Sequence, residues 1–315
     1  SGGINAAAAV ASVVGSARTT AELESTATQV IVGAPVTVTA ESTLALESRA
    51  DGSAAAGDIA SIGAAVALAF LSTVTRALIP AGSSVSAPGL TLRSDATSEA
   101  ELAGTSGAGG GSLSVAGSLA LLDGELVSEA VLAGTATIGT ESVETGGLPG
   151  ELAVTAESTH TSTVRADAAT VIAGGGVGIG ASVALSILGE VTRAAVVGSA
   201  AVFTDTLRVR ATGSSTTAVT AVMGSAAGVA VAPAIATAHH TAQVIAEIAA
   251  GAPLVLSTLE LRATQTATSQ TEASATAAAG TAAVGLPRAP PHPGPRAPAG
   301  PRPPPPPPPP PPPTP

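Results

Sequence analysis

The chain has 315 residues, a net charge of −10 with 12 basic residues against 22 acidic ones, and no cysteine. The arginines are dispersed, which argues against nucleic acid as a partner because phosphate binding needs clustered positive charge. Without cysteine there is no disulfide framework, thiolate chemistry or cysteine-based metal site. Aromatic residues make up only 1% of the chain, and its apolar residues are mostly small. This composition favours a narrow interior over a roomy globular core.

A short leucine element returns five times along the chain, with its first leucines 46, 62, 55 and 52 residues apart. Self-similarity near 50 residues is typical of repeat architectures, so a repeat array is predicted rather than a globular enzyme. The five copies are Leu44-Ala45-Leu46, Leu90-Thr91-Leu92, Leu152-Ala153-Val154, Leu207-Arg208-Val209 and Leu259-Glu260-Leu261.

Ahead of the later leucine elements, apolar residues alternate with small ones over residues 62–70, 113–121 and 177–187. A period of two places successive side chains on opposite faces, as in a β-strand. Residues 168–189 carry no charge and are long enough to cross a bilayer as a helix. The period of two and the dense glycine favour strands over that alternative.

Each repeat continues with a polar landmark such as Thr75-Arg76-Ala77, then breakers such as Ala87-Pro88-Gly89. These signals predict several short strands joined by turns, with each copy supplying two or more coils. Residues 144–150 are expected to bulge from one edge as a loop. The predicted fold class is all-β: an elongated β-solenoid, similar to a parallel β-helix, of about five imperfect repeats over residues 1–285.

Residues 286–315 hold most of the 25 prolines, so they are predicted to form an extended polyproline II stalk or linker. A second interpretation makes the unbroken proline run a site of partner binding, hydroxylation or O-glycosylation. The residues of that run are Pro303, Pro304, Pro305, Pro306, Pro307, Pro308, Pro309, Pro310, Pro311, Pro312 and Pro313.

One segment carries a family resemblance: residues 174–185 read GGGVGIGASVAL and are followed by Val191-Thr192-Arg193-Ala194. This combination resembles the long repeats of giant bacterial surface proteins, the filamentous-haemagglutinin-like and filamentous adhesins, over roughly residues 3–284. The resemblance implies a secreted β-solenoid used for adhesion or surface structure, and it transfers no catalytic residue. The proline tail resembles the hydroxyproline-rich wall or appendage glycoproteins of green algae instead.

Residues that could carry chemistry form no recognisable constellation. With no lysine, the chain lacks a phosphate-binding P-loop. His160, His239, His240 and His292 are interpreted as exposed structural residues, with His239 and His240 on opposite faces of a strand. Threonines that alternate, such as Thr264, Thr266 and Thr268, could bind ice or carry O-glycans, but their spacing is not kept between repeats. No catalytic, cofactor-binding or metal-binding residue is therefore predicted, and the chain is expected not to be an enzyme.

The sequence thus predicts a non-catalytic structural or adhesive segment of a large secreted or cell-surface repeat protein. The alternatives are an extracellular module that binds carbohydrate or ice, and a component of a glycosylated algal wall or appendage filament. Expected partners are extracellular matrix, glycans or other surface proteins, with self-association through exposed ends, and no nucleic acid. Because the chain starts at Ser1 without a leader, it is expected to be a fragment or a processed piece. The period of two in its apolar runs predicts no transmembrane span in it.

Overall fold

The computed structural model describes residues 3–23, 30–54, 59–139, 150–172, 176–198, 200–249, 251 and 253–288. Every regular element within these ranges is a β-strand, and none of them contains a helix able to cross a membrane. The long strands are β1 (Ile4–Glu22), β3 (Val36–Asp51), β4 (Ala60–Ile79), β6 (Gly89–Gly109), β7 (Leu113–Leu132), β9 (Glu151–Val171), β10 (Val177–Val196), β12 (Thr206–Ile248) and β14 (Thr258–Arg288). The short strands are β2 (Val30–Ile31), β5 (Ser84–Ala87), β8 (Thr135–Ile138), β11 (Val202–Phe203) and β13 (Leu254–Val255).

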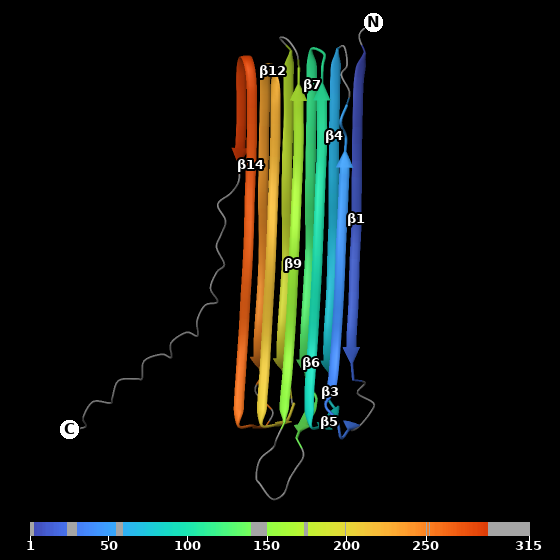
Figure 1. Ribbon diagram of the computed structural model, residues 1–315, viewed down its shortest axis with the longest axis vertical. Helices are drawn as coiled ribbons and strands as arrows, with labels where there is room; N and C mark the ends of the chain where they lie inside the picture. Colours follow the sequence, from blue (N-terminus) through green and yellow to red (C-terminus); the bar gives the residue numbers. More distant parts are fainter. Residues whose placement is uncertain are drawn as a thin grey trace, which may run out of the picture.

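The long strands form two layers that are joined through β12 (Figure 1). Residues 206–226 of β12 pair with β9, and residues 229–248 pair with β10. The first layer therefore runs β1-β4-β7-β10, continues through the C-terminal half of β12, and ends on residues 282–288 of β14. The second layer runs β3-β6-β9, continues through the N-terminal half of β12, and ends on residues 258–279 of β14.

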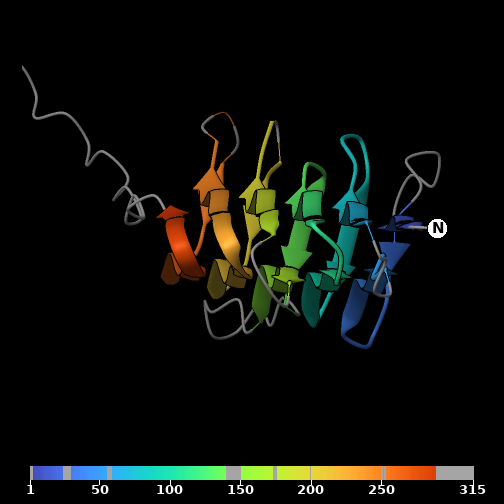
Figure 2. The ribbon, with the colours of Figure 1, turned by 90° about the horizontal axis from the view of Figure 1, so that it is seen from above.

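The five short strands form a separate sheet, in the order β2-β5-β8-β11-β13, where the chain passes between the layers. Every strand pair in both sheets is parallel. Seen from above, successive coils stack from the β1 end to the β14 end (Figure 2). The predicted all-β, parallel solenoid is confirmed.

Strand register shows which leucine elements are equivalent. Leu90, Leu152, Leu207 and Leu259 lie in one row across the second layer. The residue beside Leu90 on β3 is Val36, whereas Leu44 lies beside Ser98. Leu44-Ala45-Leu46 was therefore the wrong first copy, and Val36-Thr37-Val38 is the equivalent element. Leu44 lies an even number of residues beyond Val36 on the same strand, so both sequences show the same alternation.

Each repeat forms one coil, so the prediction of several short strands and two or more coils per repeat was wrong. Thr75-Arg76-Ala77 does not precede a turn but continues β4 to Ile79. Alternation explains this, because Thr75 and Ala77 point inward and Arg76 points outward. The chain turns instead beyond the strand, where Gly82 has a φ of 86°, a conformation that favours glycine.

The C-terminal end of the solenoid lies beyond its predicted boundary at residue 285. Strand β14 continues to Arg288, with Leu286 beside Pro233 and Pro287 beside Ala234. A proline is tolerated there because it needs no donor on the open side of an edge strand. The predicted stalk therefore loses its first residues to the sheet, and residues 289–315 lie outside the described ranges.

The interior is narrow, as the small side chains predicted. At one end of the coils leucine, isoleucine and valine fill the space between the layers, and alanine dominates the middle. Towards the glycine-rich end the backbones approach so closely that a Cβ on Gly63 would lie 2.2 Å from the carbonyl oxygen of Gly107. Small inward residues thus determine how closely the two layers can pack.

Candidate binding faces

The outer face of the first layer is apolar over about the half of its length nearest the glycine-rich end, and the other half carries ion pairs such as Arg76–Glu129. In β4 the small residues Gly63, Ala65 and Ala67 are buried, whereas Ile62 and Phe70 point outward and are 41% and 38% exposed. The same phase holds in the neighbouring strands. We define the apolar face as the outward side chains within residues 4–12, 60–68, 113–121, 177–185 and 229–237, which include no charged residue.

Register gives this face a regular relief. One row contains Ile62, Val115 and Ile179, and continues with Val231 on β12 and Val284 on β14. The next row of outward positions contains only small side chains on its central strands, and the row after that is bulky again. The small row is Ala8, Ala64, Gly117 and Ala181, and the second bulky row is Val10, Val66, Leu119, Val183 and Ile235.

The outer face of the second layer is polar and hydroxyl-rich. One rank crosses all five strands of the layer without interruption, and we call it the hydroxyl rank: Thr43, Thr97, Thr159, Ser214 and Thr266. Thr161, Thr216 and Thr268 form a parallel rank on the last three strands. The sequence interpretation that threonine spacing is not kept between repeats was therefore wrong for this face. Repeat lengths vary in the loops, and the strands restore the alignment.

Arginine–carboxylate pairs bridge neighbouring coils on the same polar face. Arg93 donates to Glu157 at 2.9 Å and to Asp95 at 3.0 Å, and Arg210 donates two hydrogen bonds to Glu260. The hydrogen bond with Asp95 raises the pKa of Arg93. The bonds between Arg210 and Glu260 raise the pKa of the arginine and lower that of the glutamate. Because these groups are exposed, each pair adds little to stability.

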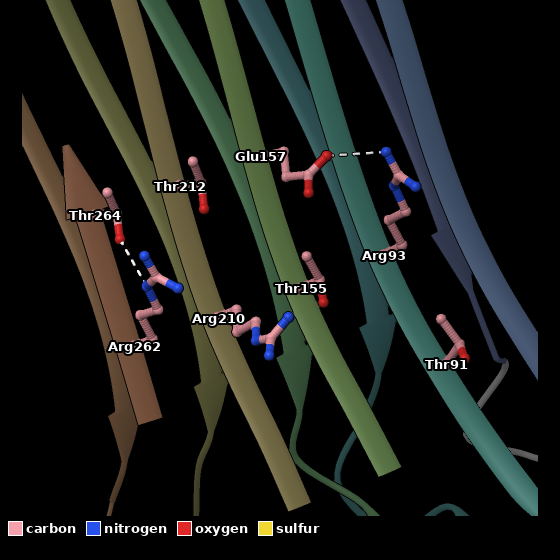
Figure 3. Close-up of a pocket in the computed structure, with 8 residues that line it drawn as sticks. All are labelled: Thr91, Arg93, Thr155, Glu157, Arg210, Thr212, Arg262 and Thr264. Atoms are coloured by element: carbon pink, nitrogen blue, oxygen red, sulfur yellow. Dashed lines mark hydrogen bonds and ion pairs between the residues drawn. The ribbon is translucent and has the colours of Figure 1, made fainter. Parts of the chain in front are cut away.

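A shallow depression of about 420 Å³ lies among these residues on β6, β9, β12 and β14. Figure 3 shows the Arg93 side chain pointing to Glu157 and Arg262 pointing to Thr264. Threonine hydroxyls and ion-paired guanidinium groups can exchange hydrogen bonds with a polyol surface. The residues that line the depression are Thr91, Arg93, Thr155, Glu157, Arg210, Thr212, Arg262 and Thr264.

A polar cluster lies inside the solenoid, between the layers. The Oε2 atom of Glu190, a residue that is 1% exposed, is 3.3 Å from Nε2 of His240. Nδ1 of His240 is in turn 3.1 Å from the hydroxyl of Ser215. Ser158 donates a hydrogen bond to the same glutamate. These links connect β9, β10 and both halves of β12 across the interior.

His160 extends this cluster and corrects the prediction that the histidines are exposed. It is 1% exposed, and its Nδ1 lies 2.6 Å from the hydroxyl of Ser98 on the adjacent strand. Burial lowers the pKa of His160 to about 4, against the opposing effect of Glu190. His239 and His240 do lie on opposite faces, with His239 exposed.

The Ser215–His240–Glu190 connection has the order of groups found in hydrolase triads. Its side chains face the space between the layers, where a substrate carbonyl could reach them only if the coils separated. Among the described residues no group of three or more acids and histidines is placed to hold a metal ion. The predicted proline site, Pro303 to Pro313, and His292 lie outside the described residues.

The chain matches no protein-family model, and comparisons with curated proteins and with solved structures also find no match.

Proposed function

We propose that the chain is a non-catalytic structural and adhesive segment of a large secreted or cell-surface repeat protein. The observation that carries this proposal is the in-register stacking of parallel coils, which gives two extended outer faces of regularly repeated side chains. Coils that stack on their neighbours can extend a rod indefinitely, and each coil covers the edge of the next. The resemblance of residues 174–185 to adhesin repeats supports an extracellular location.

Adhesion is tested by applying the purified chain to an array of glycans and to a panel of immobilised extracellular-matrix proteins. Saturable binding to a glycan or matrix protein supports the adhesive role. The matched variants are Thr155→Leu, beside the depression on the polar face, and Ser72→Leu, an exposed position on the first layer. We expect Thr155→Leu to weaken binding and Ser72→Leu to leave it unchanged. An absence of binding across both panels would overturn the adhesive role.

A second candidate function, binding of ice or of crystalline polysaccharide, is favoured by the hydroxyl rank. Neighbouring strands lie about 4.8 Å apart, and alternate residues along a strand lie about 6.7 Å apart. Threonines placed on this grid present hydroxyl and methyl groups with two fixed repeats, as a crystalline ligand requires. The central member is Thr159, with Thr97 and Ser214 beside it in the same rank.

This second function has its own test. The chain is assayed for inhibition of ice recrystallisation and for retention on chitin and cellulose. The variant Thr159→Leu disturbs the centre of the hydroxyl rank, and Ser72→Leu is the control on the opposite layer. Loss of either activity in Thr159→Leu alone supports a crystalline ligand. Equal behaviour of both variants and the unmodified chain would exclude the threonine ranks as the binding surface.

A further inference from the structure

The apolar face has the composition of an interface rather than of a solvent-exposed sheet. Ile4 is 67% exposed, Val10 is 73% exposed and Ile179 is 42% exposed. No described segment of the chain covers them. The face as defined has five strands, and its outward positions on them include no charged residue. Beyond β12 the layer continues on β14 with Val284, and Arg288 lies beside Ile235 at the end of one row. Contiguous exposed apolar surface of this kind marks an interaction site in a soluble protein.

The area of the face is sufficient for a stable dimer. Five strands spaced by about 4.8 Å cover about 24 Å, and nine residues at about 3.3 Å each cover about 30 Å. The product is about 700 Å² on one copy, and about 1,400 Å² when two copies meet. Specific protein–protein interfaces bury about 1,200–2,000 Å² in total.

Two neighbouring rows of the face are complementary to each other. The small row with Ala64, Gly117 and Ala181 is a shallow groove beside the ridge that contains Leu119 and Val183. A two-fold axis that lies in the interface, between this groove and this ridge, inserts the ridge of each copy into the groove of the other. Such a contact is isologous and closes as a dimer. Side chains interdigitate at this groove and ridge as they do between packed sheets, and the same axis places the row of Ile62 opposite the row of Leu68.

The net charge disfavours an anionic lipid surface. The chain has a net charge of −10 and no lysine, so an anionic membrane would repel it. Asp123 and Glu125 lie just beyond one end of the apolar face, on β7. The two-fold axis described above makes the strands of the two copies antiparallel, so these acids lie at opposite ends of the interface and do not face each other.

We infer that the apolar face of the first layer is a self-association surface, on which a second copy of this chain docks face to face. The polar face with its hydroxyl rank then points outward on both sides of the dimer. This inference rests on the fold and not on the adhesive role. Binding to glycans or matrix could fail while the dimer persists, and the reverse is equally possible.

The test is sedimentation-velocity ultracentrifugation of the full chain over a hundredfold range of concentration. We expect a dimer that dissociates on dilution. The variant Leu119→Arg places a charge on the central ridge and is expected to weaken dimerisation at least about tenfold. The control, Thr161→Arg, adds the same charge to an outward position on the other layer. Circular dichroism and urea unfolding establish that both variants keep the fold.

Three outcomes would overturn the inference. The unmodified chain could be monomeric throughout the range, or its association could be equally sensitive to Thr161→Arg. In the third outcome, monomers float with vesicles of phosphatidylcholine, or of phosphatidylcholine with phosphatidylserine, and Leu119→Arg abolishes this flotation. The occupant of the face would then be lipid. A dimer lost only in Leu119→Arg, without flotation, supports the second copy.

Discussion

Replacing Gly63 by alanine tests how closely the two layers approach. An added Cβ would lie 2.2 Å from the carbonyl oxygen of Gly107 and 2.7 Å from that of Gly52. Ordinary contacts of a Cβ are 3.4–4 Å, so the layers must separate locally by about 1 Å or more. Both obstructing atoms belong to backbone that is held in place, because Gly107 lies within β6 and the N–H of Gly52 donates to the carbonyl of Thr105. Overpacking usually costs about 1–3 kcal/mol, and the rigid surroundings place Gly63→Ala at the upper end of that range or beyond it.

The matched control for this substitution is Gly224→Ala. Gly224 also lies within a strand, but no atom lies within 4 Å of the Cβ that alanine would add. We expect this variant to be neutral or slightly stabilising, because alanine restricts the unfolded chain. Urea unfolding followed by circular dichroism gives the free energy of unfolding of each variant. If Gly63→Ala were as stable as Gly224→Ala, the described separation of the layers would be incorrect.

Two further predictions concern the interior. The pKa of His160 is lowered to about 4 from its ordinary 6.5. As the pH falls, the imidazole is therefore protonated in the unfolded chain before it is protonated in the folded chain. The contribution to stability is therefore complete above pH 6.5 and falls by about 3 kcal/mol as the pH reaches 4. Urea titrations at both pH values should show that His160→Asn removes this component, whereas His239→Asn, at an exposed site, leaves it; equal pH dependence in both variants would contradict the assignment. Leu207→Ala should lower the free energy of unfolding by about 2–5 kcal/mol, because Leu207 is fully buried. Its equivalent in the last coil, Leu259, is 48% exposed. Leu259→Ala should therefore lower the free energy of unfolding by less than about 1 kcal/mol. Similar losses in the two variants would show that another coil covers the last one.

The strand class and the parallel repeat could be predicted from the sequence because both follow from local periodicity. The alternation of larger and smaller residues that begins with Ile62 and Gly63 continues along β4. Similar glycine-rich alternation occurs in the later repeats. The sequence could not show which of the two alternating sets of residues points inward, because isoleucine, alanine and glycine are all compatible with burial. A polar residue in the small phase, such as Glu190, gives no clear signal either. It is buried here only because Ser158 and His240 supply hydrogen-bonding partners.

The interactions between coils could not be predicted from the sequence, for a different reason. Arg93 and Glu157 are 64 residues apart, whereas Arg210 and Glu260 are 50 apart. No fixed interval connects these pairs, since the loops differ in length between coils. His160 was misjudged because it stands between Thr159 and Thr161, which suggests a polar surface. Its burial depends on the strand phase and on Ser98 from the preceding coil.

The narrow interior and the apolar face have a common physical origin. At the glycine-rich end the layers leave no room for a side chain at Gly63, so the larger residues of β4, such as Ile62 and Val66, must occupy the outward positions. A strand that is apolar in both phases therefore exposes its larger side chains when the coil becomes thin. The second layer avoids this result, because its outward phase carries hydroxyls such as Thr97 and Thr159 and ion-paired arginines. The chain is consequently amphipathic across its thin dimension, and any assembly that covers the apolar layer leaves the threonine layer exposed.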